Sequence, residues 1–132
     1  MSGLRLAFLL AAASSICTLP ALAATESSYV YCDNGLRCFK APCPSNSALD
    51  LASGTIIKGV TIDTSGLPQQ DKARPDLSDL LFYGSIVIRG RIESRPDKAT
   101  GGIQVQKVIV AKAIERQATM KERNHCSSRG LY

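Results

Sequence analysis

The most reactive side chains of the chain are the cysteines and the single histidine. His125 directly precedes Cys126, while Cys32, Cys38 and Cys43 lie together near the start of the chain. A free thiol oriented by an imidazole can act as a nucleophile, and thiolates together with an imidazole can bind zinc. The spacing of these residues matches neither a zinc finger nor a zinc ribbon. Both kinds of chemistry need reduced thiols. The cellular compartment therefore decides whether these cysteines are reactive or form disulfides.

The first 23 residues have the three parts of a secretory signal peptide. Arg5 supplies the positive charge, residues 6–19 are predominantly apolar, and Ala21-Leu22-Ala23 matches a small-x-small cleavage site. The apolar run is too short to span a membrane, and no other long run follows it. We therefore expect removal of residues 1–23 and an exported, periplasmic or secreted domain, residues 24–132, with no membrane span.

Export determines how the cysteines are interpreted. Five cysteines are present, and Cys17 would be lost with the signal peptide, leaving Cys32, Cys38, Cys43 and Cys126. An even number in a small exported domain predicts two disulfides, with the pairing left open. Because the other three lie within twelve residues of one another, at least one of them is expected to reach Cys126. Closing so long a loop would stabilise the fold by roughly 4 kcal/mol. We accordingly predict neither a metal nor a cofactor.

No other residues form a recognisable catalytic set. Asp76 and Asp79 are better explained as the acidic start of a short helix than as an acid–base pair. A phosphate-binding glycine loop and the HExxH and GxSxG motifs are absent from the sequence. The prediction is a protein that is not an enzyme.

Basic residues follow the two strands of a predicted hairpin in residues 86–115. They could bind a polyanion, although a solvated outer face would have the same composition. The net charge of +5, which becomes +4 without Arg5, is mild, and the hairpin has no aromatic residues for stacking on bases. We therefore expect an anionic polysaccharide or the cell-envelope surface as partner, rather than nucleic acid. The candidate ligand-binding residues are Arg89, Arg91, Arg95, Lys98, Lys107 and Lys112.

A second candidate is the segment Lys40-Ala41-Pro42-Cys43-Pro44. The two prolines restrict the backbone, and a disulfide at Cys43 would anchor it. A preorganised loop loses little entropy on binding, which is how many protease inhibitors work. The alternative function is thus a secreted protease inhibitor that acts through Lys40, Ala41 and Pro42. The simpler alternative is that this segment is only a structural link.

The order of elements predicts the fold. Strands are expected at residues 28–32, 47–51 and 55–63, a short helix at 75–84, and then the long hairpin with a turn at 96–102. A bulge near Lys107, or burial of the strand on both faces, would explain the apolar run Val108-Ile109-Val110. This order is that of a small five-stranded OB barrel, with one helix between strands three and four. A disulfide-bonded β-sandwich is the alternative, and a flexible tail is expected after residue 115.

Two segments also carry a resemblance to known proteins. RCFKAPCPS (residues 37–45) and IVIRGRIESR (residues 86–95) resemble a group of small exported bacterial β-domain proteins of unassigned function. The chain is more faintly similar to netrin-like inhibitor domains, which are disulfide-bonded OB barrels. The resemblance implies an exported β-domain and assigns no site residue. The residues that precede Cys32 separate this chain from inhibitors that present an N-terminal cysteine to a metal.

Overall fold

The computed structural model of the protein describes residues 25–127. The predicted signal peptide and the last five residues lie outside the described part. Cleavage of the signal peptide therefore stays a prediction. The elements follow the chain as β1 (Ser27–Asp33), β2 (Asn46–Asp50), β3 (Ile56–Lys58), β4 (Val60–Asp63), α1 (Gln69–Lys72), α2 (Leu77–Phe82), β5 (Ile86–Pro96), the 3-10 turn η1 (Lys98–Thr100) and β6 (Val105–Gln117).

The described strands form one mixed sheet in the order β3-β2-β1-β5-β6-β4. β4 and β6 are parallel, and every other neighbouring pair is antiparallel. The prediction of a mainly β fold is confirmed. The closed five-stranded barrel is not what the structure shows, because the sheet has six strands and remains open.

The sixth strand arises because the predicted strand 55–63 is broken at Gly59. This glycine has a φ of +73°, a left-handed conformation that other residues adopt only at a cost. β3 pairs with β2 before the break, and β4 pairs with β6 after it. The two edge strands of the sheet are therefore joined by a single residue.

The predicted single helix is also corrected. Residues 69–72, which lie between the predicted strand 55–63 and the predicted helix 75–84, form the short helix α1, and the predicted helix shortens to α2. Leu77 and Leu80 pack against the core beside the buried Leu81, as their spacing along the helix predicts.

Irregularities in the long hairpin lie elsewhere than predicted. The register shifts lie between Val87 and Ile88 and between Arg89 and Gly90, which leaves Glu115 and Lys112 of β6 without partners on β5. The predicted bulge near Lys107 is wrong. The other explanation of the apolar run, burial of the strand on both faces, is supported, because the neighbouring residues Val108 and Ile109 are both buried.

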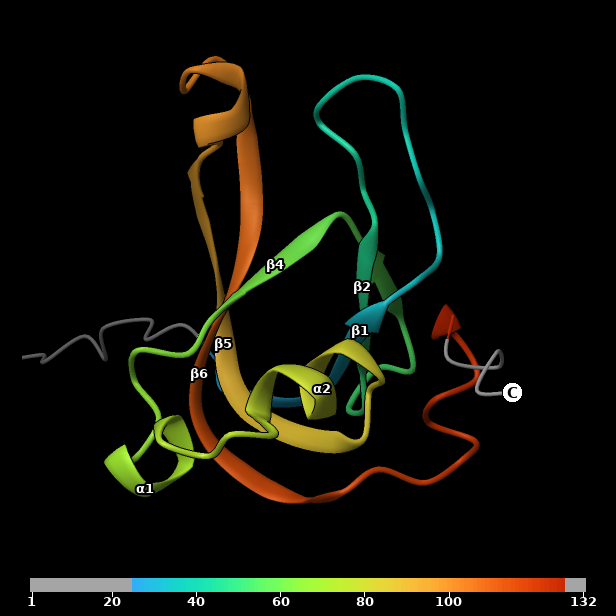
Figure 1. The fold of residues 1–132 in the computed structure, drawn as a ribbon, viewed down its shortest axis with the longest axis vertical. Helices are drawn as coiled ribbons and strands as arrows, with labels where there is room; N and C mark the ends of the chain where they lie inside the picture. The colour runs from blue at the N-terminus through green and yellow to red at the C-terminus, as the bar shows by residue number, and fades with distance from the viewer. Residues whose placement is uncertain (1–24, 128–132) are drawn as a thin grey trace, which may run out of the picture.

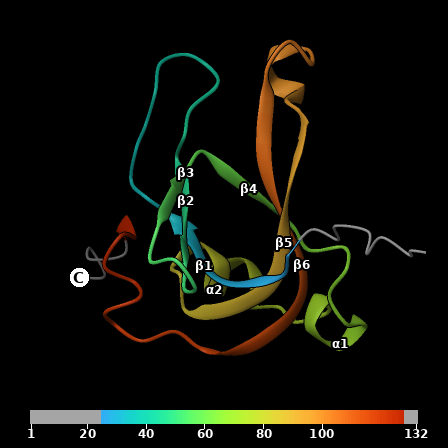
Figure 2. The ribbon, with the colours of Figure 1, turned by 180° about the vertical axis from the view of Figure 1, so that it is seen from behind.

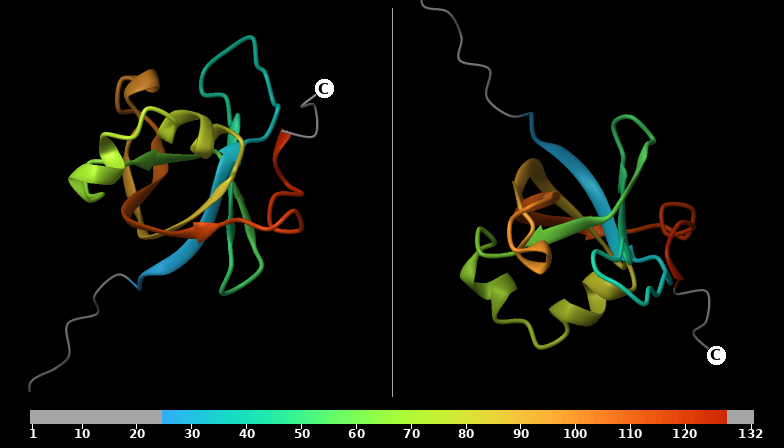
Figure 3. Two further views of the ribbon diagram at one scale, coloured as in Figure 1. Left: turned by 60° about the horizontal axis from the view of Figure 1, so that its bottom comes forward. Right: turned by 90° about the horizontal axis from the view of Figure 1, so that it is seen from above.

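The core lies on both faces of β1. Tyr29 and Tyr31 contribute to the larger apolar cluster, which α2 covers, whereas Val30 and Cys32 belong to a smaller one. This alternation follows from the two-residue period of a strand. The right panel of Figure 3 shows α1 and α2 on the same side of the sheet.

Two projections extend from the same end of the molecule (Figures 1 and 2). We call residues 34–45, between β1 and β2, the loop arm, and residues 96–105, at the tip of the β5–β6 hairpin, the hairpin arm. The end of the molecule that they form is called the arm end.

The segment after β6 is held by more than the predicted contact at Cys126. Arg116 forms an ion pair with Glu122 at 2.8 Å, and Arg123 Nε donates to the carbonyl of Tyr83 at 3.1 Å. Cys126 itself is buried in the smaller cluster.

Candidate functional site

Most of the predicted basic strip is engaged in ion pairs. Arg89 Nε lies 2.9 Å from Glu115 Oε1, and Arg91 lies 2.7 Å from Glu93. The hydrogen bonds from Arg89 and Ser28 lower the pKa of Glu115, which keeps this partner ionised.

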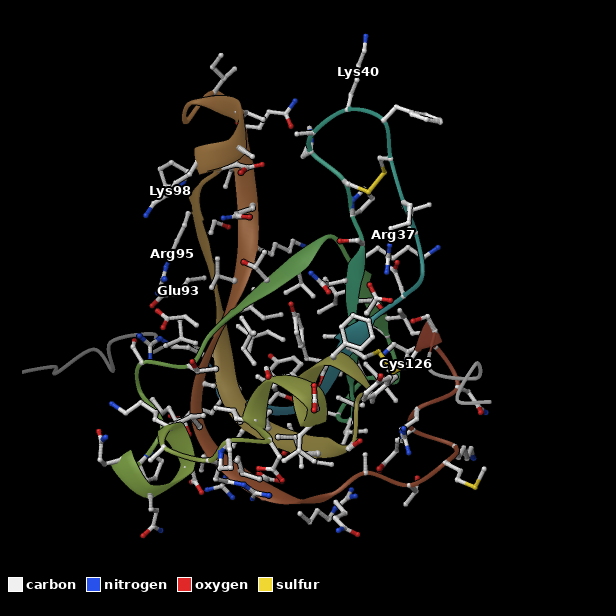
Figure 4. The ribbon with its side chains drawn as sticks, viewed as in Figure 1. Arg37, Lys40, Glu93, Arg95, Lys98 and Cys126 are labelled. Carbon is white, nitrogen blue, oxygen red and sulfur yellow. A yellow bond between two sulfur atoms is a disulfide. The ribbon has the colours of Figure 1, made fainter. Side chains whose placement is uncertain are left out.

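The same pattern continues along β5 and β6. Arg95 contacts Glu93 at 3.0 Å and Asp63 of β4 at 2.9 Å, and Lys112 pairs with Glu26 at 2.5 Å. Figure 4 shows Arg95 beside Glu93 on the flank of the hairpin. Hydrogen bonds from Ser65 and then Arg95 lower the pKa of Asp63 to about 2.

Four predicted ligand-binding residues therefore each have a carboxylate partner. Arg89, Arg91, Arg95 and Lys112 are matched by Glu115, Glu93, Asp63 and Glu26. A polyanion bound at the strip would have to compete with these pairs. The strip alone is thus a weak candidate for the binding surface.

The other two predicted residues, Lys98 and Lys107, belong to a different group. Between residues 25 and 127, five cationic side chains have neither an ion pair nor a hydrogen bond, and four of them lie towards the arm end. Sequence patterning missed Lys58, because it lies on the short edge strand β3, outside the hairpin. The five are Lys40, Lys58, Lys98, Lys107 and Lys121.

A cleft of about 570 Å³ separates the two arms. The loop arm supplies residues 41–44, and the hairpin arm supplies Gln104 and Val105. Lys58 and Lys107 line it together with Asn46, so cationic and amide groups face the same space. Among the described residues, Asp97 supplies the one carboxylate in the lining, and this side chain is buried and accepts a hydrogen bond from the Ala99 N–H at 2.9 Å.

The loop arm is fixed at its base and at its middle. The Asn34 side chain donates to the Pro44 carbonyl at 2.7 Å, and Arg37 pairs with Asp33 at 2.9 Å. The Cys38–Cys43 disulfide closes the upper part of the arm. Lys40, Ala41 and Pro42 are exposed, and Figure 4 shows Lys40 directed away from the body. This arrangement can present a short, constrained segment to a partner.

The predicted disulfide framework is confirmed, with pairs Cys32–Cys126 and Cys38–Cys43. His125 Nε2 lies 3.3 Å from Cys32 Sγ and 3.1 Å from the Val30 carbonyl oxygen. Burial lowers the pKa of His125. Because the nearby sulfurs are bonded to each other, the group of Cys32, His125 and Cys126 offers neither a free nucleophile nor thiolate ligands in this form.

The two aspartates predicted at the helix start flank the beginning of α2. Asp76 is bound by Arg74 at 3.0 Å, which lowers the pKa of its carboxyl. Asp79 lies in the first turn of the helix, as predicted.

Comparison of the chain with protein-family models, with characterised proteins and with solved structures finds no match. Within residues 25–127, no helix has the length and apolar character needed to cross a membrane.

Proposed function

We propose that the protein is an exported, non-enzymatic binding module that attaches to polyanions of the cell envelope or extracellular space, through the cleft at the arm end. The observation that carries the proposal is the distribution of free positive charge. The strip on β5 and β6 is matched by carboxylates, whereas Lys58 and Lys107 line the cleft with no partner among the described residues. Acidic polysaccharide is the favoured ligand, because amide side chains for hydroxyl groups accompany the lysines.

The strand connections support this proposal by analogy. If β3 and β4 are counted as one strand bent at Gly59, the pairings have the order of an OB fold. We infer that the open sheet is a variant of that fold. Known OB folds bind oligosaccharides and oligonucleotides with the loop between strands one and two and the loop between strands four and five. The loop arm and the hairpin arm occupy these two positions.

Chromatography on immobilised heparin, used as a sulfated polyanion probe, tests the proposal. The variant Lys58→Gln/Lys107→Gln should elute at lower salt than the unaltered protein and reduce the slope of log affinity against log salt by about 1–2. The matched control is Lys72→Gln/Lys121→Gln, which removes two exposed charges elsewhere. Equal elution of the two double variants would refute the cleft as the binding site.

The exposed loop arm supports one alternative function, that of a protease inhibitor. A disulfide joins Cys38 to Cys43, and Lys40 lies exposed between them. A serine protease that prefers lysine should then be inhibited by the protein, and Lys40→Ala should abolish the inhibition. Unimpaired proteolysis across a panel of serine and metalloproteases would exclude this alternative.

A further inference from the structure

The tips of both arms expose large apolar side chains. Phe39 on the loop arm is fully exposed, and Ile103 and Val105 on the hairpin arm are 88% and 68% exposed. Leu36, lower on the loop arm, is also exposed. Single exposed apolar residues are ordinary. Here they are concentrated on the two projections that extend from one end of the molecule (Figures 1 and 2).

The charges beside these apolar residues are all positive. Residues 36–43 contain Lys40 and Arg37, of which Arg37 is paired with Asp33 at the base of the loop arm. Residues 98–105 contain Lys98, and neither range contains an acidic residue. Lys40 follows Phe39 directly and has no partner among the described residues. Lys98 lies at the start of η1 and is directed outward from the hairpin arm in Figure 4. The nearest acidic residue of this arm, Asp97, is buried beneath the tip.

This combination distinguishes a lipid surface from a protein partner. Protein interfaces are depleted of lysine in their buried centres and usually form one contiguous patch. Separate projecting tips with an apolar end and flanking lysines instead suit the boundary between headgroups and acyl chains, where apolar side chains are buried by only about 5–10 Å. Anionic headgroups attract the lysines.

We propose that the arm end docks reversibly onto an anionic lipid bilayer, with Phe39 and Ile103 inserted among the lipids and with Lys40 and Lys98 against the lipid phosphates. The inference rests on the proposed anion-binding function and names a bilayer as one source of the anionic charge. Each tip contributes little apolar area, so both arms have to insert together for measurable binding.

The absence of tryptophan from the chain permits a direct test. Phe39→Trp and Ile103→Trp each introduce a single fluorophore at a tip. Met120→Trp is the matched control, because Met120 is 84% exposed and residues 118–123 lie at the other end of the molecule (Figure 1). Each variant is mixed with vesicles of phosphatidylglycerol and phosphatidylcholine and with vesicles of phosphatidylcholine alone. Both kinds of vesicle are prepared with and without brominated lipid.

We expect a blue shift and quenching by brominated lipid at positions 39 and 103, but not at position 120, and only with vesicles that contain phosphatidylglycerol. A solvent-exposed signal at both tips while the protein sediments with the vesicles would overturn the proposal. Equal shifts at all three positions would overturn it as well, because they would indicate nonspecific adsorption or unfolding.

A second variant separates this inference from the proposed function. Phe39→Ser/Ile103→Ser should reduce binding to phosphatidylglycerol vesicles at least tenfold and leave elution from heparin unchanged. Both side chains are exposed, so an unchanged midpoint of urea unfolding is expected. Unchanged vesicle binding by this variant would refute insertion while leaving the heparin test of the cleft intact. The converse pair of results is that Phe39→Ser/Ile103→Ser loses vesicle binding while Lys58→Gln/Lys107→Gln elutes from heparin like the unaltered protein. That pair of results would refute the cleft alone.

Discussion

At the scale of single residues, the number of basic side chains on a surface says little about its affinity for anions. Arg89 and Arg91 have the residue type and the strand position expected of a polyanion-binding strip. Their nearest charges, however, are the carboxylates of Glu115 and Glu93. Lys58 and Lys107 form no such pair with any residue between 25 and 127. The availability of a charge depends on its neighbours in the folded sheet.

This view predicts the effect of removing two carboxylates. Glu93→Gln/Glu115→Gln should release Arg89, Arg91 and part of the charge of Arg95, and the variant should elute from immobilised heparin at higher salt. Surface ion pairs contribute only about 0–1 kcal/mol each, so the free energy of unfolding should change little. Asp71→Asn/Asp79→Asn, which removes two acidic groups near α1 and α2, is the control for net charge. Equal elution of both variants would mean that the strip has no local effect.

At the scale of elements, the sequence was sufficient where periodicity is strong. It predicted β5 and much of β6, because alternating β-branched residues are hard to accommodate otherwise. The helical spacing of Leu77, Leu80 and Leu81 likewise predicted α2. It failed at β3 and β4, because the break at Gly59 depends on which strands pair on each side of it. The cleft was beyond prediction for the same reason: its lining comes from segments that only strand pairing brings together.

The irregular part of the hairpin depends on one close backbone contact. A Cβ atom added at Gly90 would lie 2.3 Å from the Val110 carbonyl oxygen, a backbone atom that cannot move without disturbing the pairing of β5 and β6. Gly90→Ala should therefore lower the free energy of unfolding by about 3 kcal/mol. A Cβ atom added at Gly54 would meet nothing within 4 Å, but the φ of this residue is +72°. Gly54→Ala should therefore cost about 1 kcal/mol through backbone strain alone. Urea unfolding measures both, and equal losses would contradict the steric explanation.

At the scale of the whole molecule, the two disulfides have different roles. Cys32–Cys126 connects β1 to the end of the described chain across 94 residues, whereas Cys38–Cys43 spans five residues within the loop arm. In the chain-entropy model, the first stabilises the fold by about 4–5 kcal/mol and the second by about 2 kcal/mol.

Replacing each pair with alanine should reproduce that order in urea unfolding. Cys32→Ala/Cys126→Ala should lower the free energy of unfolding by more than the entropic contribution of the cross-link, because both sulfurs are buried in the smaller apolar cluster. Cys38→Ala/Cys43→Ala should remain folded, because this disulfide lies within the loop arm and outside both apolar clusters. A larger loss of stability from the second pair would contradict this assignment of roles.

The same long-range connections determine how the molecule responds to acid. The pKa of Asp63 falls from 3.8 to about 2 through Ser65 and Arg95, and that of Glu122 falls from 4.5 to about 2 through Arg116 and Thr119. A lowered pKa means that the folded state binds protons less readily than the unfolded state. Stability from these carboxylates is therefore complete above about pH 4.5 and is lost as the pH falls towards 2.

The full shifts would correspond to about 2–3 kcal/mol each. Because both side chains are partly exposed and solvent screens their ion pairs, each carboxylate should account for about 1 kcal/mol over this window. Urea unfolding at pH 6, 4 and 2 measures the loss, and Asp63→Asn/Glu122→Gln should flatten the pH dependence while lowering stability at pH 6. The two groups lie in different places: Asp63 fixes edge strand β4 to the flank of the hairpin through Arg95, and Glu122 fixes the segment after β6. If the double variant keeps the full acid sensitivity, other carboxylates hold the sheet together, and these two contacts are local.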